Sequence, residues 1–281
     1  MRVRLPVAPV VWRGPFALVG GGLTCVAIGL AIAGGVLAPH DPFAVSTLPF
    51  QPPGAAHWLG TDDLGRDTLS GVLTGARVSL LVGFVTAATA ALLGATVGGI
   101  AGFYGGLVDD ALMRLTELVQ VAPRFFLAVL VAALFGPSIV LLTILLAVTF
   151  WPLTARLVRS QVLSLRQREY VIAARAVGLT EARILLRHVL PNVVGIVVVT
   201  AALQVGSAII VEASLSFLGL GDRSVISWGY MLNDAQPFLR VAWWMSVFPG
   251  IALVLTVLGV NLFADALYAS WDPGRRSVIG K

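Results

Sequence analysis

Long apolar stretches separated by short charged segments dominate the sequence. Five stretches contain no Asp, Glu, Lys or Arg and are long enough to cross a bilayer: 14–39, 78–108, 125–155, 188–211 and 241–264. A helix needs about 20 apolar residues to cross a hydrocarbon core of about 30 Å. The pattern therefore predicts an all-α membrane protein.

The third stretch is interrupted by Gly136-Pro137. Proline breaks the helical hydrogen-bond ladder and disfavours helix in the residue before it. Residues 125–135 alone would be roughly 16 Å long, too short to cross. We therefore predict one span over 109–135, which must accept Arg114, Glu117 and Arg124, and a further span over 138–157, giving six.

The distribution of Lys and Arg decides between five and six spans. With six spans and a cytoplasmic N-terminus, 13 cationic residues lie on the cytoplasmic side and 4 outside, whereas five spans give 7 and 12. Cations gather on the cytoplasmic side of membrane proteins, so the count selects six spans with both termini cytoplasmic. The basic N-terminus resembles a signal peptide, but the apolar run 16–38 exceeds the 7–15 residues of such a segment, and we expect a retained first span.

The expected layout follows from these choices. It comprises a cytoplasmic N-terminus (1–13), a first span (14–38), an extracytoplasmic outer loop (39–77), a core over 78–271 with spans near 78–103, 109–135, 138–157, 191–212 and 241–267, a cytoplasmic inner loop (158–190) within that core, and a cytoplasmic tail (272–281).

Composition agrees with a membrane protein and excludes several function classes. Of the 281 residues, 58% are hydrophobic and 12% charged, with a mean hydropathy of +0.92. Soluble domains are about 45–50% apolar and about 25% charged.

Several function classes can be excluded. No segment offers a basic soluble domain for nucleic acid. The single lysine, Lys281, cannot follow a glycine-rich phosphate loop, so an ATP-driven process would need its ATPase on another subunit. The single cysteine, Cys25, excludes an internal disulfide and a multi-thiolate metal site.

The outer loop begins with several prolines and continues into a run of polar residues at 57–67. Thr61 can cap a short amphipathic helix on the outer membrane surface, with Asp62 and Asp63 in its first turn. Because Arg66 lies beside Asp67, we expect capping and ion pairing here. The three histidines, His40, His57 and His188, are far apart in sequence and on both sides of the membrane, so we predict neither a histidine cluster nor a metal site.

The inner loop reads as two helices separated at Gly178. Thr180 would cap the second helix, and Pro191 would open the fifth span. The first helix carries small residues, Ala173 and Ala174, among charged ones. Such a surface can fit closely into a groove of a partner protein. A solvated, positive-inside loop would explain its arginines but not its alanines.

Polar and small residues inside the spans have two interpretations. Gln204, Ser207 and Glu212 could line a translocation pathway, or they could make hydrogen bonds between helices. Glycines at positions 94, 98 and 102 repeat every four residues, which allows close helix packing within this chain or against another subunit.

Three blocks of residues resemble a known family. Ala173-Ala174-x-x-x-Gly178, followed by Leu190-Pro191, resembles the "EAA" loop of transmembrane subunits in binding-protein-dependent ABC importers. The block 57–67, with Asp62, Asp63, Gly65, Arg66 and Asp67, and the block 212–221 resemble the C-type permease of dipeptide, oligopeptide and nickel importers. Two positions depart from the loop pattern: Ile172 replaces its glutamate and His188 its isoleucine. Glu169, typical of the peptide subfamily, could supply the missing charge.

The resemblance implies a fold and a set of partners. The fold is a type I ABC importer transmembrane domain in the bacterial cytoplasmic membrane, non-catalytic itself, with no cofactor on this chain. Expected partners are a B-type permease, two cytoplasmic ATPase subunits (or one fused or homodimeric ATPase) that bind ATP and magnesium, an extracytoplasmic substrate-binding protein, a peptide substrate and membrane lipid. In this family, Glu169, Ala173, Ala174, Gly178, Leu190 and Pro191 would belong to the ATPase-coupling loop, and the 62–67 block would serve docking or gating.

Other classes of membrane protein fit less well. A secondary transporter would place carboxylates or histidines near the midplane and show two related halves, and neither is present in the sequence. A membrane enzyme would need a cluster of nucleophiles or metal ligands. Within the importer family, nickel or another small solute is the alternative to peptides.

Overall fold

A computed structural model describes residues 15–45 and 48–271, and its regular secondary structure is helical. The all-α prediction is confirmed, whereas the predicted termini 1–13 and 272–281 lie outside the described residues. The elements are α1 (Pro15–Leu37), α2 (Thr68–Tyr104), α3 (Gly106–Val121), α4 (Arg124–Phe135), α5 (Ile139–Leu165), α6 (Glu169–Ala176), α7 (Glu181–Ile184), η2 (Leu185–Val189), α8 (Leu190–Leu215), η3 (Ser216–Leu220), α9 (Trp228–Ala235), η4 (Gln236–Phe238) and α10 (Trp244–Trp271).

Five helices in the described chain are long and apolar enough to cross a membrane, and a bent pair makes a possible sixth span. The five are α1, α2, α5, the continuous helix 181–220 and α10. The bent pair is α3 with α4, which meet at 67°. We expected an uninterrupted span over 109–135. The break falls at Ala122, whose extended backbone (φ −85°, ψ 129°) is the conformation favoured before a proline such as Pro123.

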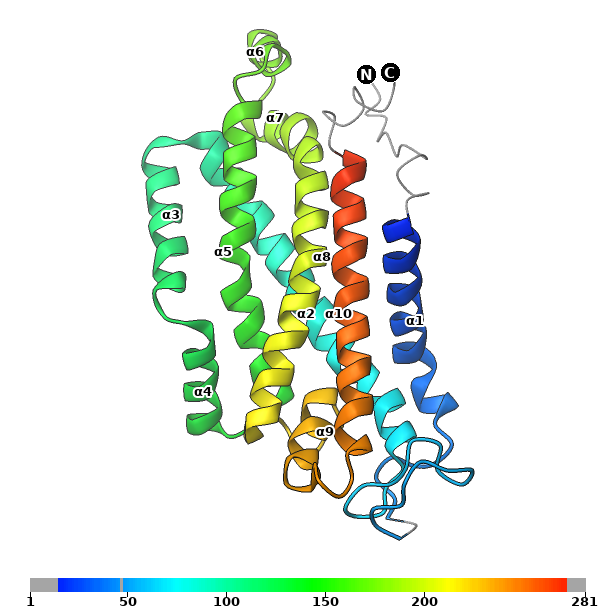
Figure 1. The fold of residues 1–281 in the computed structure, drawn as a ribbon. Coiled ribbons are helices and arrows are strands. Elements are labelled where there is room, and N and C mark those ends of the chain that lie inside the picture. Colours follow the sequence, from blue (N-terminus) through cyan, green and yellow to red (C-terminus); the bar gives the residue numbers. More distant parts are fainter. Residues whose placement is uncertain (1–14, 46–47, 272–281) are drawn as a thin grey trace.

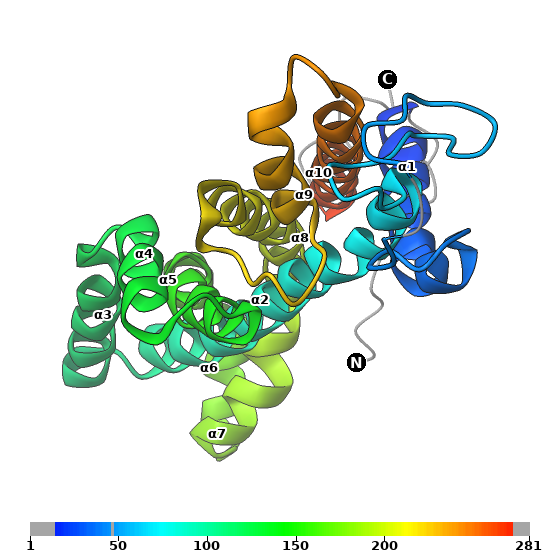
Figure 2. The ribbon, with the colours of Figure 1, turned by 90° about the horizontal axis from the view of Figure 1, so that it is seen from below.

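The two ends of the bundle carry different elements (Figure 1). The start of α1, the end of α10 and the helices α6 and α7 lie at one end, and α9 and the outer loop lie at the other. Seen along the bundle, α3 and α4 form one edge and α1 lies near the opposite edge (Figure 2). Both the inner loop and the described ends of the chain therefore occupy the same end of the molecule.

Helices α2 and α5 pack against each other along most of their length, through the glycine repeat of α2. A Cβ at Gly94, Gly98 or Gly102 would meet Thr154, the Ala155 carbonyl or the Arg159 carbonyl, respectively. The small-residue repeat therefore permits close packing within this chain, the first of the two interpretations left open above.

The predicted amphipathic helix of the outer loop, capped by Thr61, is wrong. The N-cap is Asp67, whose side chain accepts a hydrogen bond from the Ser70 backbone N–H at 2.8 Å. Asp62 instead closes a turn by accepting from the backbone N–H groups of Leu64 and Arg66. No proline interrupts the 37 residues after Asp67, so the helix continues over all of them, about 55 Å, directly into the second span.

Pro191 lies in the first turn of α8, as predicted for the start of the fifth span, but the helix does not begin there. The helix is continuous from Glu181, and Pro191 follows a π-helical turn, η2, at the beginning of α8. Proline has no N–H to donate to the preceding turn. The wider π turn accommodates this missing bond without ending the helix.

Candidate functional site

The first helix of the inner loop, α6, is anchored to the bundle by one apolar face. Val171 is fully buried and Ala174 is 9% exposed. They pack into a cluster at the inner end of α2, α5 and α8, together with Phe103, Val158, Val162, Ile184, Leu185, Val189 and Val193, with Leu190 at its edge. Ala174 thus contributes its small side chain to an internal contact rather than to the outer surface of α6.

The opposite face of α6 is exposed and largely apolar. Ile172 is 57% exposed and Val177, just after the helix, is 82% exposed, with Ala173 between them on the surface. Glu169 is the exposed first residue of α6. Hydrophobic residues clustered at an exposed, projecting tip are typical of a protein-binding surface.

Gly178 turns the chain between α6 and α7. Its φ of +84° lies in the left-handed region, which residues with a Cβ seldom adopt. Space is available around it, since nothing within the described chain lies within 4 Å of an added Cβ. The glycine is therefore required by the backbone conformation of the turn rather than by crowding in this chain.

A bidentate ion pair holds the two helices of the inner loop together. Arg175 donates from Nε to Glu181 Oε1 at 2.9 Å and from Nη2 to Oε2 at 3.1 Å. The same guanidinium lies 5.4 Å from the ring centre of Phe103, at the end of α2. Arg175 therefore joins α6, α7 and α2, a role the sequence did not indicate because its partners are distant or lie across the glycine turn.

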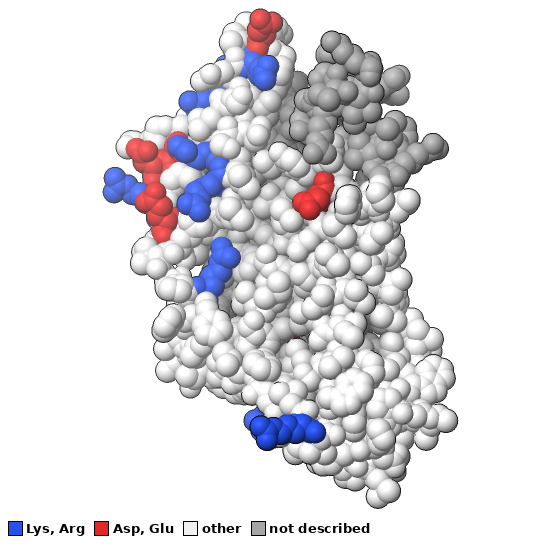
Figure 3. Space-filling view, viewed as in Figure 1, with Lys and Arg blue, Asp and Glu red and all other residues white. Residues whose placement is uncertain are grey.

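Two further arginines of α5 connect the inner end of the bundle. Arg159 makes a bidentate pair with Asp109 of α3, with Nη2 2.6 Å from Oδ2. Arg166 Nη1 donates to the Gly102 carbonyl at 3.2 Å, near the last turn of α2. Figure 3 shows charged side chains gathered over this end, around α3, α5 and α6, while the rest of that face is almost free of charge.

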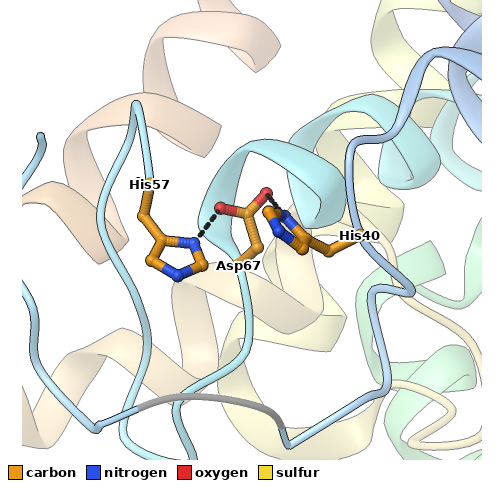
Figure 4. A group of neighbouring side chains, drawn as sticks. All are labelled: His40, His57 and Asp67. Carbon is orange, nitrogen blue, oxygen red and sulfur yellow. Dashed lines mark hydrogen bonds and ion pairs between the residues drawn. The ribbon is translucent and has the colours of Figure 1, made fainter. Parts of the chain in front are cut away.

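At the opposite end, the outer loop is closed onto the start of α2 by Asp67. His57 Nδ1 donates to Asp67 Oδ1 at 2.9 Å (Figure 4). The Ser70 hydroxyl donates to Asp67 Oδ2 at 2.7 Å. His57 and Asp67 are both buried, and the half-exposed His40 approaches Oδ2 at 3.8 Å. Burial opposes ionisation of Asp67, but the bonds from Ser70 and His57 outweigh it and hold the pKa of Asp67 below its usual value.

The expectation that no histidines come together is wrong, because the fold brings His40 and His57 to one carboxylate. One ligand atom of each of His40, His57 and Asp67 lies within 4.8 Å of the others. These residue types could bind a divalent metal such as zinc. In the described arrangement, however, the Asp67 oxygens already accept hydrogen bonds from His57 and Ser70, so the group acts as a clasp for the outer loop.

A second polar group of the outer loop connects it to α9. Arg66 Nε lies 2.5 Å from Asp62 Oδ2, and its Nη2 lies 3.3 Å from Asp234 of α9. Gly65, at φ +78°, forms the turn that places Arg66 there. Burial and then the neighbouring carboxylates Asp62 and Asp234 raise the pKa of Asp63 above its usual value. The 62–67 block thus ties the outer loop to both α2 and α9.

The polar residues of α8 lie at helix contacts or on the surface. Gln204 is buried and donates from Nε2 to the Phe150 carbonyl at 3.1 Å and to the Thr154 hydroxyl at 3.2 Å, both in α5. Ser207 is exposed and donates to the Leu203 carbonyl of its own helix. Of the two interpretations, pathway lining and a hydrogen bond between helices, the described conformation shows the hydrogen bond for Gln204.

Glu212 is fully buried near the outer end of α8. Its Oε1 accepts from the Ser216 and Ser227 hydroxyls, each at 2.8 Å. Ser227 is also the N-cap of α9, where its hydroxyl accepts from the Tyr230 backbone N–H. Glu212 thus fixes the start of α9 against α8.

Comparison with known proteins places the chain among transport permeases. Residues 94–277 match the family described as "Binding-protein-dependent transport system inner membrane component". The chain is 42% identical over 228 residues to the dipeptide transport system permease protein DppC of Alkalihalophilus pseudofirmus, a match that covers 81% of this chain and 75% of the relative.

Two other relatives match over more of the chain. The oligopeptide transport system permease protein OppC of Mycobacterium bovis is 39% identical over 256 residues, covering 89% of this chain and 88% of the relative. The glutathione transport system permease protein GsiD of Pectobacterium atrosepticum is 37% identical over 269 residues, covering 94% and 89%.

Proposed function

Since the chain belongs to the binding-protein-dependent transport inner membrane component family, we propose that it is the permease subunit of an ATP-driven importer that carries short peptides across the cytoplasmic membrane. It is a multi-pass membrane component of a transport system and not an enzyme. The peptide substrate is inferred from relatives named for dipeptide and oligopeptide transport, to which this chain is about 40% identical.

One observation carries the proposal: a short helix, α6, projects from the bundle end and exposes an apolar face while its other face is anchored. Ile172, Ala173 and Val177 form the exposed face, and Val171 and Ala174 form the anchor. A cytoplasmic ATPase subunit that received this face could move α6, and the anchored contacts would pass that motion to α2, α5 and α8. Gly178 and the bond between Arg175 and Glu181 would keep the two loop helices in a fixed relation.

The isoleucine at position 172 fits an apolar contact between α6 and the ATPase subunit. Where the family pattern has glutamate, this chain exposes an isoleucine. Glu169 lies one turn before Ala173 on the exposed surface, so it is available to an arginine or lysine of the ATPase subunit. Leu190 and Pro191 support the loop from its base rather than contact the partner.

We infer six spans with both termini and the inner loop in the cytoplasm. The start of α1, the end of α10 and α6 share one end of the bundle, which supports that arrangement (Figure 1). Both termini can lie on one side of the membrane only if the number of spans is even. Counting the bent pair α3–α4 as one span gives six. The outer loop and α9 would then face the extracytoplasmic binding protein.

An ATP-driven importer needs further subunits besides this chain. A second, related permease would complete the pathway, and two ATPase subunits would bind and hydrolyse ATP with magnesium. Binding of ATP would draw the ATPases together and move α6, so that the spans change from inward-facing to outward-facing. The binding protein would deliver its peptide to the outer face in that state.

Reconstitution of the complete complex in vesicles tests the proposal. Vesicles with the binding protein outside and ATP at the ATPase subunits should accumulate a labelled dipeptide, and omission of this chain or of ATP should abolish accumulation. Labelled Ni²⁺ serves as the comparison substrate. Accumulation of Ni²⁺ without the dipeptide would overturn the assignment of peptides, and accumulation without ATP would overturn the assignment to an ATP-driven importer.

A further inference from the structure

An arginine without an anionic partner lies where the bent pair α3–α4 breaks. Arg124 is the first residue of α4 and is partly buried, and its guanidinium lies 4.4 Å from the ring centre of Phe150 in α5. Within residues 15–45 and 48–271, no carboxylate pairs with it. Arg159 and Arg175, by contrast, each make a bidentate pair with a carboxylate.

The position of Phe150 sets the depth of this charge. Phe150 is the twelfth of the 27 residues of α5, so it lies about 17 Å along the helix from its outer end. That distance is close to the middle of a hydrocarbon core of about 30 Å. An ionised side chain at this depth is costly unless it faces protein or a water-filled path, and such residues usually mark substrate or ion pathways.

The surroundings hold the guanidinium in place and leave it accessible. The guanidinium lies over the ring of Phe150, and an aromatic face does not use its N–H donors. The Phe150 backbone is itself held by the hydrogen bond from Gln204. Pro123 gives α4 no side-chain cap, so the positive end of the helix adds to the potential at the same point.

A narrow apolar crevice begins one turn from Arg124, toward the outer end of the bundle. It is lined by one face of α4, beginning at Ala128 one turn from Arg124, and by residues of α5 and of the end of α8. Leu142 and Leu145 of α5 and Leu220 after α8 are among its walls. The wall that α4 presents on the outer side of Arg124 is therefore apolar.

We propose that Arg124 binds the C-terminal carboxylate of a peptide as it passes the middle of the membrane. This inference rests on the proposed function, because it takes a short peptide as the cargo. Short peptides differ in their side chains but share a terminal carboxylate, and a planar guanidinium matches a carboxylate through two parallel hydrogen bonds. One fixed arginine could therefore serve many peptides.

The test uses the complete reconstituted complex and two ligands, a labelled dipeptide and its C-terminal amide, each at concentrations that saturate the binding protein. Arg124→Gln should slow import of the dipeptide at least tenfold and remove the difference in rate between the dipeptide and its amide. Arg124→Lys should restore part of the dipeptide import rate and part of the difference in rate between the dipeptide and its amide. Arg114→Gln, which removes an exposed arginine from α3 of the same bent pair, is the matched control and should transport like wild type.

Three outcomes would overturn the inference. Dipeptide import by Arg124→Gln equal to that of Arg114→Gln would show that the charge is not needed. An equal loss for the dipeptide and its amide would assign Arg124 a structural role. Loss of co-purification with the sister permease would make Arg124 part of an interface with that subunit. Failure of the wild-type complex to import any peptide would instead refute the proposed function.

Discussion

Asp67 shows how one side chain can organise a whole segment. It caps α2 through Ser70, it receives a hydrogen bond from His57, and through His57 it draws the outer loop onto the bundle. The carboxylate is buried, and each of its oxygens accepts a hydrogen bond. Its ionised form is therefore stabilised by the native arrangement, and the clasp should depend on pH.

We predict that the clasp weakens in acid. The pKa of Asp67 in the folded chain is below its usual value, so its stabilising contribution is complete above the ordinary aspartate pKa of about 4 and is lost as the pH falls through the lowered pKa. Hydrogen exchange of the backbone amides of 57–68, corrected for the intrinsic effect of pH, should show constant protection from pH 7 to about 5 and a loss below about 4. In Asp67→Asn, protection should be low at every pH. A pH-independent wild-type profile would refute the role of the carboxylate.

Glu212 offers a second prediction for a single side chain. Glu212→Leu would leave the Ser216 and Ser227 hydroxyls without their acceptor, at a cost of about 1–3 kcal/mol. Glu212→Gln keeps one acceptor oxygen and should cost less. Thermal unfolding in detergent should show the larger decrease in Tm for the leucine variant. Ser214→Ala, which removes an exposed hydroxyl bonded only within α8, should leave Tm almost unchanged. Equal Tm values for the leucine and glutamine variants would contradict this account.

Among the helices, α2 and α5 have a strict requirement for a small residue at their contact. The Ala155 carbonyl occupies the space that a side chain at Gly98 would need, and backbone cannot rotate away as a long side chain can. The glycine repeat therefore fixes the separation of α2, which follows the outer loop, from α5, which leads into the inner loop.

Two matched glycine substitutions should differ in their effect on stability. Gly98→Ala should destabilise the chain by about 1–3 kcal/mol, because α2 and α5 must move apart. Gly29→Ala places the same methyl group in α1, where nothing in the described chain lies within 4 Å of it, and should be neutral or stabilising by up to about 1 kcal/mol through helix propensity. Thermal unfolding midpoints of the two variants, measured in the same detergent, would show whether contact with α5 is the cause of the destabilisation. A decrease of similar size in both would mean that contact with α5 is not the cause.

The existence of five long apolar helices could be predicted from the sequence, because a membrane requires long uninterrupted apolar windows. Helix ends were harder to predict. Thr61 and Asp67 are both suitable caps, and the choice depends on His57 and Ser70, which only the fold brings to Asp67. The break before Pro123 was missed because the more conspicuous Gly136-Pro137 accounted for the length of the third apolar stretch.

The candidate site could be predicted only in part. Local pattern located the inner loop and its turn at Gly178, since both depend on adjacent residues. The inward orientation of Ala174, the contact of Arg175 with Phe103 and the meeting of His40 with His57 join segments that are distant in sequence. Helical periodicity alone could not place them, because nothing in the sequence shows which face of a short loop helix meets the bundle.

At the scale of the whole molecule, the inner loop could transmit force only if its two helices move together with the bundle. The described contacts supply that rigidity: Val171 anchors α6, and Arg175 links α6 to Glu181 and to the end of α2. The ion pair is about two-fifths to one-half exposed, so its effect on global stability should be small, about 0.2–1 kcal/mol. Its importance would lie in the orientation of α6.

A charge exchange separates these two effects. Arg175→Glu places two carboxylates together and should free α6 from α7, so that peptide import and peptide-stimulated ATP hydrolysis by the complete complex fall several-fold while Tm changes little. The double variant Arg175→Glu with Glu181→Arg restores an ion pair of opposite direction and should recover much of the coupling. Recovery should remain incomplete, because the contact of Arg175 with Phe103 is not restored.

Arg183→Glu is the control for the change in net charge. It reverses a charge on α7 at a residue without an ion pair in the described chain. If Arg175→Glu retains full stimulated hydrolysis, or if the double variant is no better than the single one, the ion pair does not hold α6 in its coupling orientation.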